Sequence, residues 1–218
     1  MQIDIRVLEL LSSKICHDLV SPVSAINNGV ELIEDIGGSV IDEAMKLISD
    51  SAGNASRRLR LFRMAYGRAG SEGVIPVKEV RQTAEQYLAH SKTRMTWADN
   101  AIPDAAAENK GFLKVVLNLL MLVDELLPYG GEVIVNPTDT LDLMGCSLSI
   151  TGKSITYTPQ IHDALYQQVA IDDLTPRTVQ AYVTGIFATH FGFSLASNKA
   201  ADDKLDLSLS CIRLAAAS

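Results

Sequence analysis

Two long stretches near the N-terminus repeat apolar residues at steps of three and four, and they constrain the fold more than any other feature. The first stretch runs from about residue 7 to 36, and the second from about 41 to 66. This spacing places the apolar side chains along one face of a helix. Because Gly37 and Gly38 separate the stretches, they predict an antiparallel helical hairpin. The apolar positions are Leu8, Leu11, Ile15, Leu19, Pro22, Ile26, Val30 and Ile33, followed by Ile41, Met45, Ile48, Ala52, Ala55, Leu59, Phe62 and Tyr66.

A hairpin of this length needs a partner, since two helices alone cover little of each other's surface. No other part of the sequence has a comparable heptad-like repeat. The pattern therefore predicts a homodimer in which two hairpins form a four-helix bundle.

The first stretch carries a histidine beside an acid, His17-Asp18, and then an interior proline, Pro22. An interior proline costs a helix about 3 kcal/mol and bends it. At about 100° per residue, His17 lies opposite the apolar face. An exposed imidazole is either simply solvated or a nucleophile that a large partner can reach. Asp18 can accept a ring N–H and leave the other nitrogen free to attack. The predicted partner-binding surface around His17 comprises Leu10, Lys14, Val20, Ser21, Ser24 and Asn28.

The remainder of the chain mixes helices with strands. The glycine-rich segment 67–76 indicates a linker. We therefore divide the chain into domains 1–69 and 70–218. Mainly antiparallel strands combined with helices predict an α/β sandwich, and the whole chain is therefore assigned to the α+β class. The expected helices span residues 77–92, 108–127, 159–170 and 175–190, and the expected strands span 94–99, a segment from 132, 141–150 and 204–214.

Composition excludes several classes of protein. The chain of 218 residues carries a net charge of −7, which gives no general attraction to nucleic acid or to an anionic membrane. Its longest apolar run, "VVLNLLMLV", is too short to span a bilayer, and the N-terminus lacks a signal-peptide pattern. Three widely spaced cysteines form no CxxC motif. We therefore expect a cytoplasmic protein that binds neither nucleic acid nor membrane.

The stretch from His17 to Pro22, "HDLVSP", resembles the H-box of sensor histidine kinases. The longer segment "HDLVSPVSAINNGVE" is similar to the ChpT family of bacterial histidine phosphotransferases. This resemblance implies that His17 is phosphorylated. It also implies that the partners are receiver domains, one belonging to a hybrid histidine kinase and others to response regulators that govern the cell cycle.

The segment 112–135, "FLKVVLNLLMLVDELLPYGGEVIV", resembles the N-box region of the ATP-binding domain of histidine kinases. Leu122 stands where that family has its magnesium-binding asparagine, and no aspartate follows the strand that ends at Ile150. Gly185 alone stands near the place of the glycine-rich phosphate lid. The resemblance thus implies a degenerate histidine-kinase-type ATPase domain that binds no cofactor, with magnesium held by the partner receiver domain.

These features predict a histidine phosphotransferase in which His17 takes a phosphoryl group from one receiver aspartate and passes it to another. Asp18 is expected to orient the ring. Two alternatives remain. An ATP-using sensor histidine kinase fragment is disfavoured by Leu122, and a non-catalytic dimeric scaffold would bind receiver domains without taking up phosphate.

Overall fold

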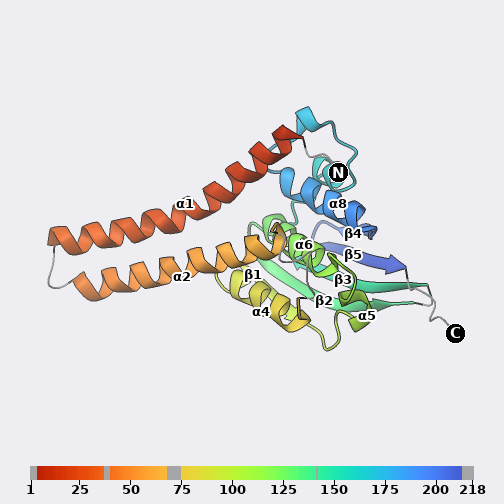
Figure 1. Cartoon of the computed structure of the whole chain (residues 1–218), viewed down its shortest axis with the longest axis horizontal. Helices are drawn as coiled ribbons and strands as arrows, with labels where there is room; N and C mark the ends of the chain where they lie inside the picture. Colours follow the sequence, from red (N-terminus) through yellow and green to blue (C-terminus); the bar gives the residue numbers. More distant parts are fainter. Residues whose placement is uncertain (1–3, 37–39, 68–74, 141, 213–218) are drawn as a thin grey trace.

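The computed structural model describes residues 4–36, 40–67, 75–140 and 142–212. The predicted Gly37-Gly38 turn and the predicted domain division near residue 70 lie outside these ranges. Two long helices, α1 (Ile5–Ile36) and α2 (Ile41–Ala65), form an antiparallel hairpin that projects from a compact part containing the sheet (Figure 1). The hairpin predicted from the apolar repeats is therefore confirmed.

Within the hairpin, α1 and α2 approach each other closely beside Gly29. A Cβ atom at Gly29 would lie 2.6 Å from the Cγ1 atom of Ile48, so a larger residue there would separate the helices. Pro22 is buried, and α1 continues through it as one helix. Figure 1 shows that the two halves of α1 run in different directions, as expected for a helix that contains a proline.

In the structure, some residues of the predicted apolar face of the hairpin are buried and others are exposed. Ile48 lies between the two helices, whereas Leu8 and Met45 are about half exposed. The outer part of the hairpin projects away from the compact part, whereas its root is packed into it (Figure 1). Val7 of α1 is buried there, together with the residues near the end of α2, Leu61, Phe62, Met64 and Ala65.

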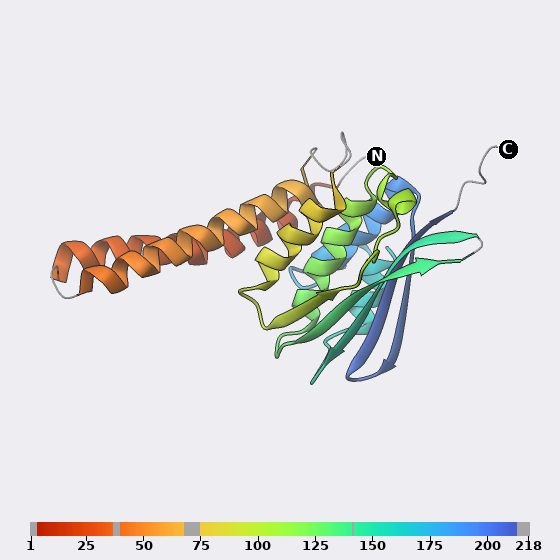
Figure 2. The same cartoon turned by 90° about the horizontal axis from the view of Figure 1, so that it is seen from below.

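The compact part is a five-stranded sheet with helices on one face (Figure 2). The strand order is β1-β2-β3-β5-β4, in which β1 pairs in parallel with β2 and all other pairs are antiparallel. The strands are β1 (Thr93–Trp97), β2 (Gly131–Asp139), β3 (Leu143–Gly152), β4 (Ser194–Ala201) and β5 (Lys204–Ile212). The helices are α4 (Val77–Leu88), α5 (Asp104–Ala107), α6 (Phe112–Leu126), α7 (Pro159–Leu165) and α8 (Val179–Phe191), with a short 3-10 helix at Ile171–Asp173.

Several predicted boundaries differ from the observed ones. α6 begins at Phe112 rather than near residue 108, because Gly111 adopts a left-handed conformation with φ of 84° that precedes the helix. α7 ends at Leu165 instead of 170, just before Gln167, whose φ is also positive. Strand β4 was not predicted, since its sequence "SLASNKAA" is polar and short in β-branched residues.

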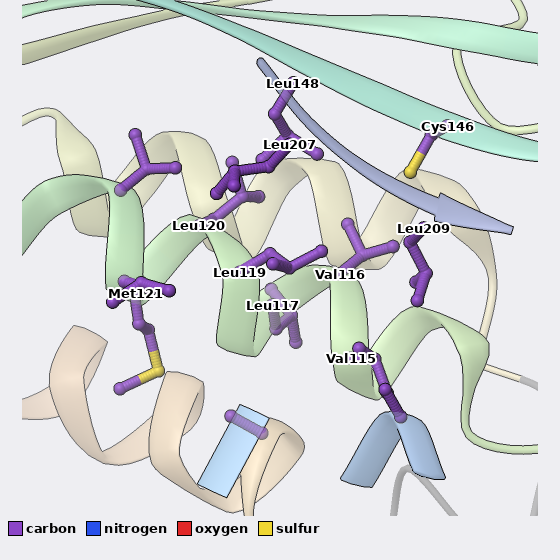
Figure 3. Close-up of a cluster of buried hydrophobic side chains, with 14 of the residues drawn as sticks. Val115, Val116, Leu117, Leu119, Leu120, Met121, Cys146, Leu148, Leu207 and Leu209 are labelled. Atoms are coloured by element: carbon purple, nitrogen blue, oxygen red, sulfur yellow. The ribbon is translucent and has the colours of Figure 1, made fainter. Parts of the chain in front are cut away.

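Helix α6 forms the centre of the core. Almost all of its side chains are buried, because the sheet covers one side of it and the neighbouring helices cover the other. Figure 3 shows Leu120 facing Leu148 and Leu207 of the sheet, whereas Met121 points away from the sheet. One continuous apolar core therefore joins the root of the hairpin to the sheet. No helix among the described residues has both the length and the apolar character needed to cross a bilayer.

A buried hydrogen-bond chain links α2, α6 and α8 at the root of the hairpin. The Asn118 amide donates to the Ala65 carbonyl at 2.9 Å, and the Gln180 amide donates to Asn118 Oδ1 at 3.2 Å. The Tyr66 hydroxyl donates to Gln180 Oε1 at 2.5 Å. These bonds fix the direction in which the hairpin leaves the compact part, because they connect its last turn to two core helices.

We predict that Asn118→Leu lowers the free energy of unfolding by about 1–3 kcal/mol, because the Ala65 carbonyl would lose the Asn118 amide donor and the Gln180 amide would keep only the Asn118 backbone carbonyl as acceptor. Urea denaturation followed by circular dichroism measures this loss. The control is Gln82→Leu, which replaces an exposed amide on α4 and should change stability by less than about 0.5 kcal/mol. Equal effects from both substitutions would show that the buried bonds contribute nothing specific.

Candidate functional site

His17 lies in the middle of α1, and its side chain is 90% exposed. The helix keeps the imidazole rigidly attached while its outward direction leaves the ring accessible to another protein. Val20, Ser21, Ser24 and Asn28 are also exposed, and they follow His17 on the same side of α1. The structure therefore gives His17 the open, mainly small and polar surroundings that the sequence predicts.

Leu10 and Lys14 depart from that prediction. Leu10 is partly buried against the apolar core, and the Lys14 ammonium lies 2.6 Å from Glu125 Oε1 of α6. The cause is the packing of the first turns of α1 against the compact part, which the helical repeat alone does not reveal. The predicted partner-binding residues are thus divided into an exposed group around His17 and a pair that faces the rest of the chain.

Asp18 is turned inward, with 23% of its side chain exposed. Its Oδ1 atom lies 3.7 Å from His17 Nδ1, and its Oδ2 atom lies 3.6 Å from Arg58 Nη1 of α2. Both distances are too long for hydrogen bonds and short enough for direct electrostatic interaction. Asp18 therefore connects the exposed histidine with a cation on the second helix of the hairpin.

The junction beneath Asp18 is rich in ionisable groups. Burial raises the pKa of Glu125, and the nearby Lys14 ammonium opposes this effect. Burial also raises the pKa values of the Tyr66 and Tyr87 hydroxyls, so both remain neutral. Asp124 accepts a hydrogen bond from the Thr93 hydroxyl at 2.9 Å. The carboxylates of Asp18, Asp124 and Glu125 thus share a region in which uncompensated negative charge would be costly.

Arg58 is the residue that the sequence analysis missed. Its guanidinium carbon lies 5.8 Å from the centre of the Tyr87 ring, over its face, and its Nε atom is buried without a hydrogen-bond partner among the described residues. The sequence places four arginines close together, at positions 57, 58, 60 and 63, and no local pattern distinguishes one of them. Only the packing of α2 against α1 and α4 selects Arg58.

A cavity of about 780 Å3 lies beside this junction, bordered by α6, α7 and the start of α8, with Lys14 of α1 at its edge. Leu122 lines it, at the position where the kinase ATPase family has its magnesium-binding asparagine, and is 1% exposed. A leucine side chain has no oxygen to coordinate magnesium. In the described part of the chain, no three histidine, cysteine or acidic residues cluster as metal ligands would. Leu122 therefore offers no oxygen to a magnesium ion in this cavity.

The geometry combines an exposed imidazole nucleophile, an adjacent carboxylate and a helical platform. Such a site can accept a group from an electrophile that a large partner presents, because the described residues leave the His17 side chain 90% exposed. The comparisons with known proteins agree with this chemistry.

Residues 77–203 match the family described as the histidine phosphotransferase C-terminal domain. The protein phosphotransferase ChpT of Brucella abortus (strain 2308) is 34% identical over 202 residues, which cover 89% of this chain and 90% of that protein. A solved bacterial phosphotransferase is 30% identical with a TM-score of 0.76, covering 96% of this chain and 98% of the other.

More distant structures share only the fold. The histidine kinase ThkA, solved in complex with the response regulator protein TrrA, has a TM-score of 0.51 at 10% identity and covers 96% of this chain and 63% of that one. The helical hairpin followed by a kinase-type ATPase fold is thus confirmed. The family match over residues 77–203 and the 34% sequence identity to ChpT over 89% of the chain show that the chain belongs to the ChpT family of bacterial histidine phosphotransferases.

Proposed function

We propose that His17 is the residue that carries the phosphoryl group, and that it does so between receiver-domain aspartates of a phosphorelay. The observation that carries this proposal is the 90% exposure of His17 on a rigid helix, with the Asp18 carboxylate facing its Nδ1 atom. The exposed neighbours Val20, Ser21, Ser24 and Asn28 are proposed to contact the receiver domain.

The geometry supports Nε2 as the attacking atom. With the Nδ1 proton directed at Asp18, the Nε2 lone pair attacks the phosphorus of an aspartyl phosphate. The bond between phosphorus and the aspartyl oxygen breaks, and its electron pair leaves with the carboxylate. The ring gains a positive charge that the Asp18 carboxylate stabilises. Transfer to the acceptor aspartate is the reverse of this step.

Most other catalytic groups are proposed to come from the receiver domains, including the magnesium ion. Phosphoryl transfer depends mainly on positioning and electrostatic stabilisation, so this chain needs little besides a nucleophile and a docking surface. ThkA, which shares the fold, was solved with a response regulator bound. A hybrid histidine kinase as donor and response regulators as acceptors fit this arrangement.

All three cysteines are free, which agrees with a reducing cytoplasm.

The first test is His17→Ala, which should abolish phosphoryl uptake from a phosphorylated receiver domain while circular dichroism and oligomeric state stay unchanged, because the side chain is exposed. Label transferred from the receiver should be acid-labile in the unsubstituted protein, as phosphohistidine is. His90→Ala, at another exposed histidine, serves as the control and should leave uptake intact. Uptake by His17→Ala would place the acceptor elsewhere, and no uptake by the unsubstituted protein would favour the non-catalytic scaffold.

We also propose that the chain works as a homodimer through its hairpin. Apolar side chains about half exposed follow one side of both helices, namely Leu8, Val23 and Val30 of α1 and Ile41, Met45 and Leu59 of α2. At about 100° per residue, each set falls within roughly 60° on its helix. An apolar side on both helices of a hairpin is typical of a helix-bundle interface.

We predict that Met45→Asp dissociates this dimer, because an unpaired carboxylate would be buried at the interface. A loss of about 3 kcal/mol in the free energy of dimerisation corresponds to a dissociation constant roughly 100-fold higher. Analytical ultracentrifugation measures the change, with Lys46→Asp on the exposed side of α2 as control. Ile48 is less suitable, since it lies between α1 and α2 and its replacement would disrupt the hairpin itself. A monomeric unsubstituted protein at tens of micromolar would contradict the dimer.

The compact part is proposed to bind no nucleotide. Leu122 supplies no magnesium ligand, and the nearby Glu125 carboxylate is paired with Lys14. Isothermal titration calorimetry with ATP and magnesium should therefore give no heat of binding, and labelled ATP alone should not label His17. Binding of ATP at micromolar concentration would restore the sensor-kinase alternative.

A further inference from the structure

His17, Asp18 and Arg58 form a chain of three groups that spans both helices of the hairpin. One Asp18 oxygen faces His17 Nδ1 at 3.7 Å, and the other faces Arg58 Nη1 at 3.6 Å. We infer that Arg58 is a positioning residue for phosphoryl transfer, which holds the Asp18 carboxylate toward His17 and thereby selects the tautomer that attacks. This inference rests on the proposed role of His17.

Asp18 needs such a restraint because of its place on the helix. Adjacent residues diverge by about 100° around a helix axis and do not face each other. Without a restraint, the Asp18 side chain would therefore change between rotamers instead of keeping one oxygen beside the histidine ring. Arg58 acts on the second carboxylate oxygen from the opposite helix, which leaves the first oxygen directed at Nδ1. A small movement on docking of a receiver domain would bring both contacts to hydrogen-bond distance.

The nearby carboxylates of Asp124 and Glu125 make a cation beside Asp18 more favourable. Asp18, Asp124 and Glu125 all act electrostatically on the Tyr87 hydroxyl, so the three carboxylates lie near one another. Their mutual repulsion would drive Asp18 outward. Lys14, one turn before Asp18 on α1, is held by Glu125 at 2.6 Å. The Arg58 guanidinium is the group that directly offsets the charge of Asp18.

Arg58 is itself held in place by the compact part. Its guanidinium lies over the ring of Tyr87 from α4, and its buried Nε atom has no hydrogen-bond partner in the part of the chain that the structure describes. Buried polar atoms are nearly always hydrogen-bonded in folded proteins. An Arg58 Nε atom without a partner therefore lowers the stability of the fold. The contact with Tyr87 gives the compact part a role in the reaction: it holds the arginine that orients the aspartate.

The decisive variant is Arg58→Met, which removes the charge and keeps most of the side-chain length. At saturating phosphorylated receiver domain, we expect the rate of uptake to fall about 10-fold, because the Asp18 carboxylate is no longer fixed. Receiver affinity should change by less than about twofold, since Arg58 does not lie on the exposed face around His17. Long-range proton–nitrogen NMR correlation of the His17 ring should show a shift from the Nδ1–H form toward the Nε2–H form.

Three further variants separate positioning from structure. Arg60→Met removes an exposed arginine from the same helix and should behave as the unsubstituted protein. Arg58→Lys should recover part of the lost rate. Tyr87→Leu should reproduce part of the Arg58→Met defect, whereas Tyr87→Phe keeps the ring and should not. If Arg58→Met does not fold, Arg58→Lys and Tyr87→Leu still report on the inference.

A double substitution provides the last criterion. Asp18→Asn should lower uptake on its own, and adding Arg58→Met should cause no further loss, because Arg58 acts through Asp18. Uptake by Arg58→Met within about twofold of the unsubstituted protein, an unchanged tautomer, or an equal loss in Arg60→Met would each overturn the inference. These results are distinct from failure of the proposed function, which would show as phosphoryl uptake by His17→Ala.

Discussion

The burial of the hairpin's root in the core is the constraint on which the rest of the structure depends. Val7 of α1 and the last turns of α2 belong to the same apolar core as helix α6 and the sheet. The bond from Asn118 to the Ala65 carbonyl adds a directional link to this packing. Because the root is fixed, the remainder of the hairpin projects from the compact part (Figure 1). His17 is exposed on its first helix.

The site shows how one helix divides two adjacent residues between solvent and protein. His17 is accessible to a partner, and Asp18 faces a junction where α2, α4 and α6 meet. A nucleophile that receives a group from another protein must be exposed, whereas the group that orients it must be held by its surroundings. The angular step of the α-helix provides both arrangements in successive residues.

The compact part has the fold of a kinase-type ATPase domain. Its cavity is lined by Leu122 and by the Lys14–Glu125 pair, which ties the histidine-bearing helix to α6. Through Tyr87 and Arg58 the same part also reaches Asp18. The compact part therefore contacts the histidine-bearing helix and the surroundings of Asp18 through α6 and α4.

The sequence by itself determined the features that depend on local order. Apolar repeats predicted both hairpin helices, and the position of His17 on the helical wheel predicted its exposure, because helix geometry follows directly from residue spacing. The polar strand β4 was missed, since it is held by pairing with β5 and carries little intrinsic signal of its own.

Only the tertiary structure decided which distant side chains meet. Lys14 was expected on the accessible face, yet it pairs with Glu125, a residue 111 positions later in the sequence. Nothing in the sequence distinguishes Arg58 from its neighbouring arginines. Only the packing of α1, α2 and α4 places its guanidinium beside Asp18. Contacts of this kind depend on the relative position of whole elements in space. Residue spacing along one helix sets the direction of a side chain, and the packing of the other elements decides what lies there.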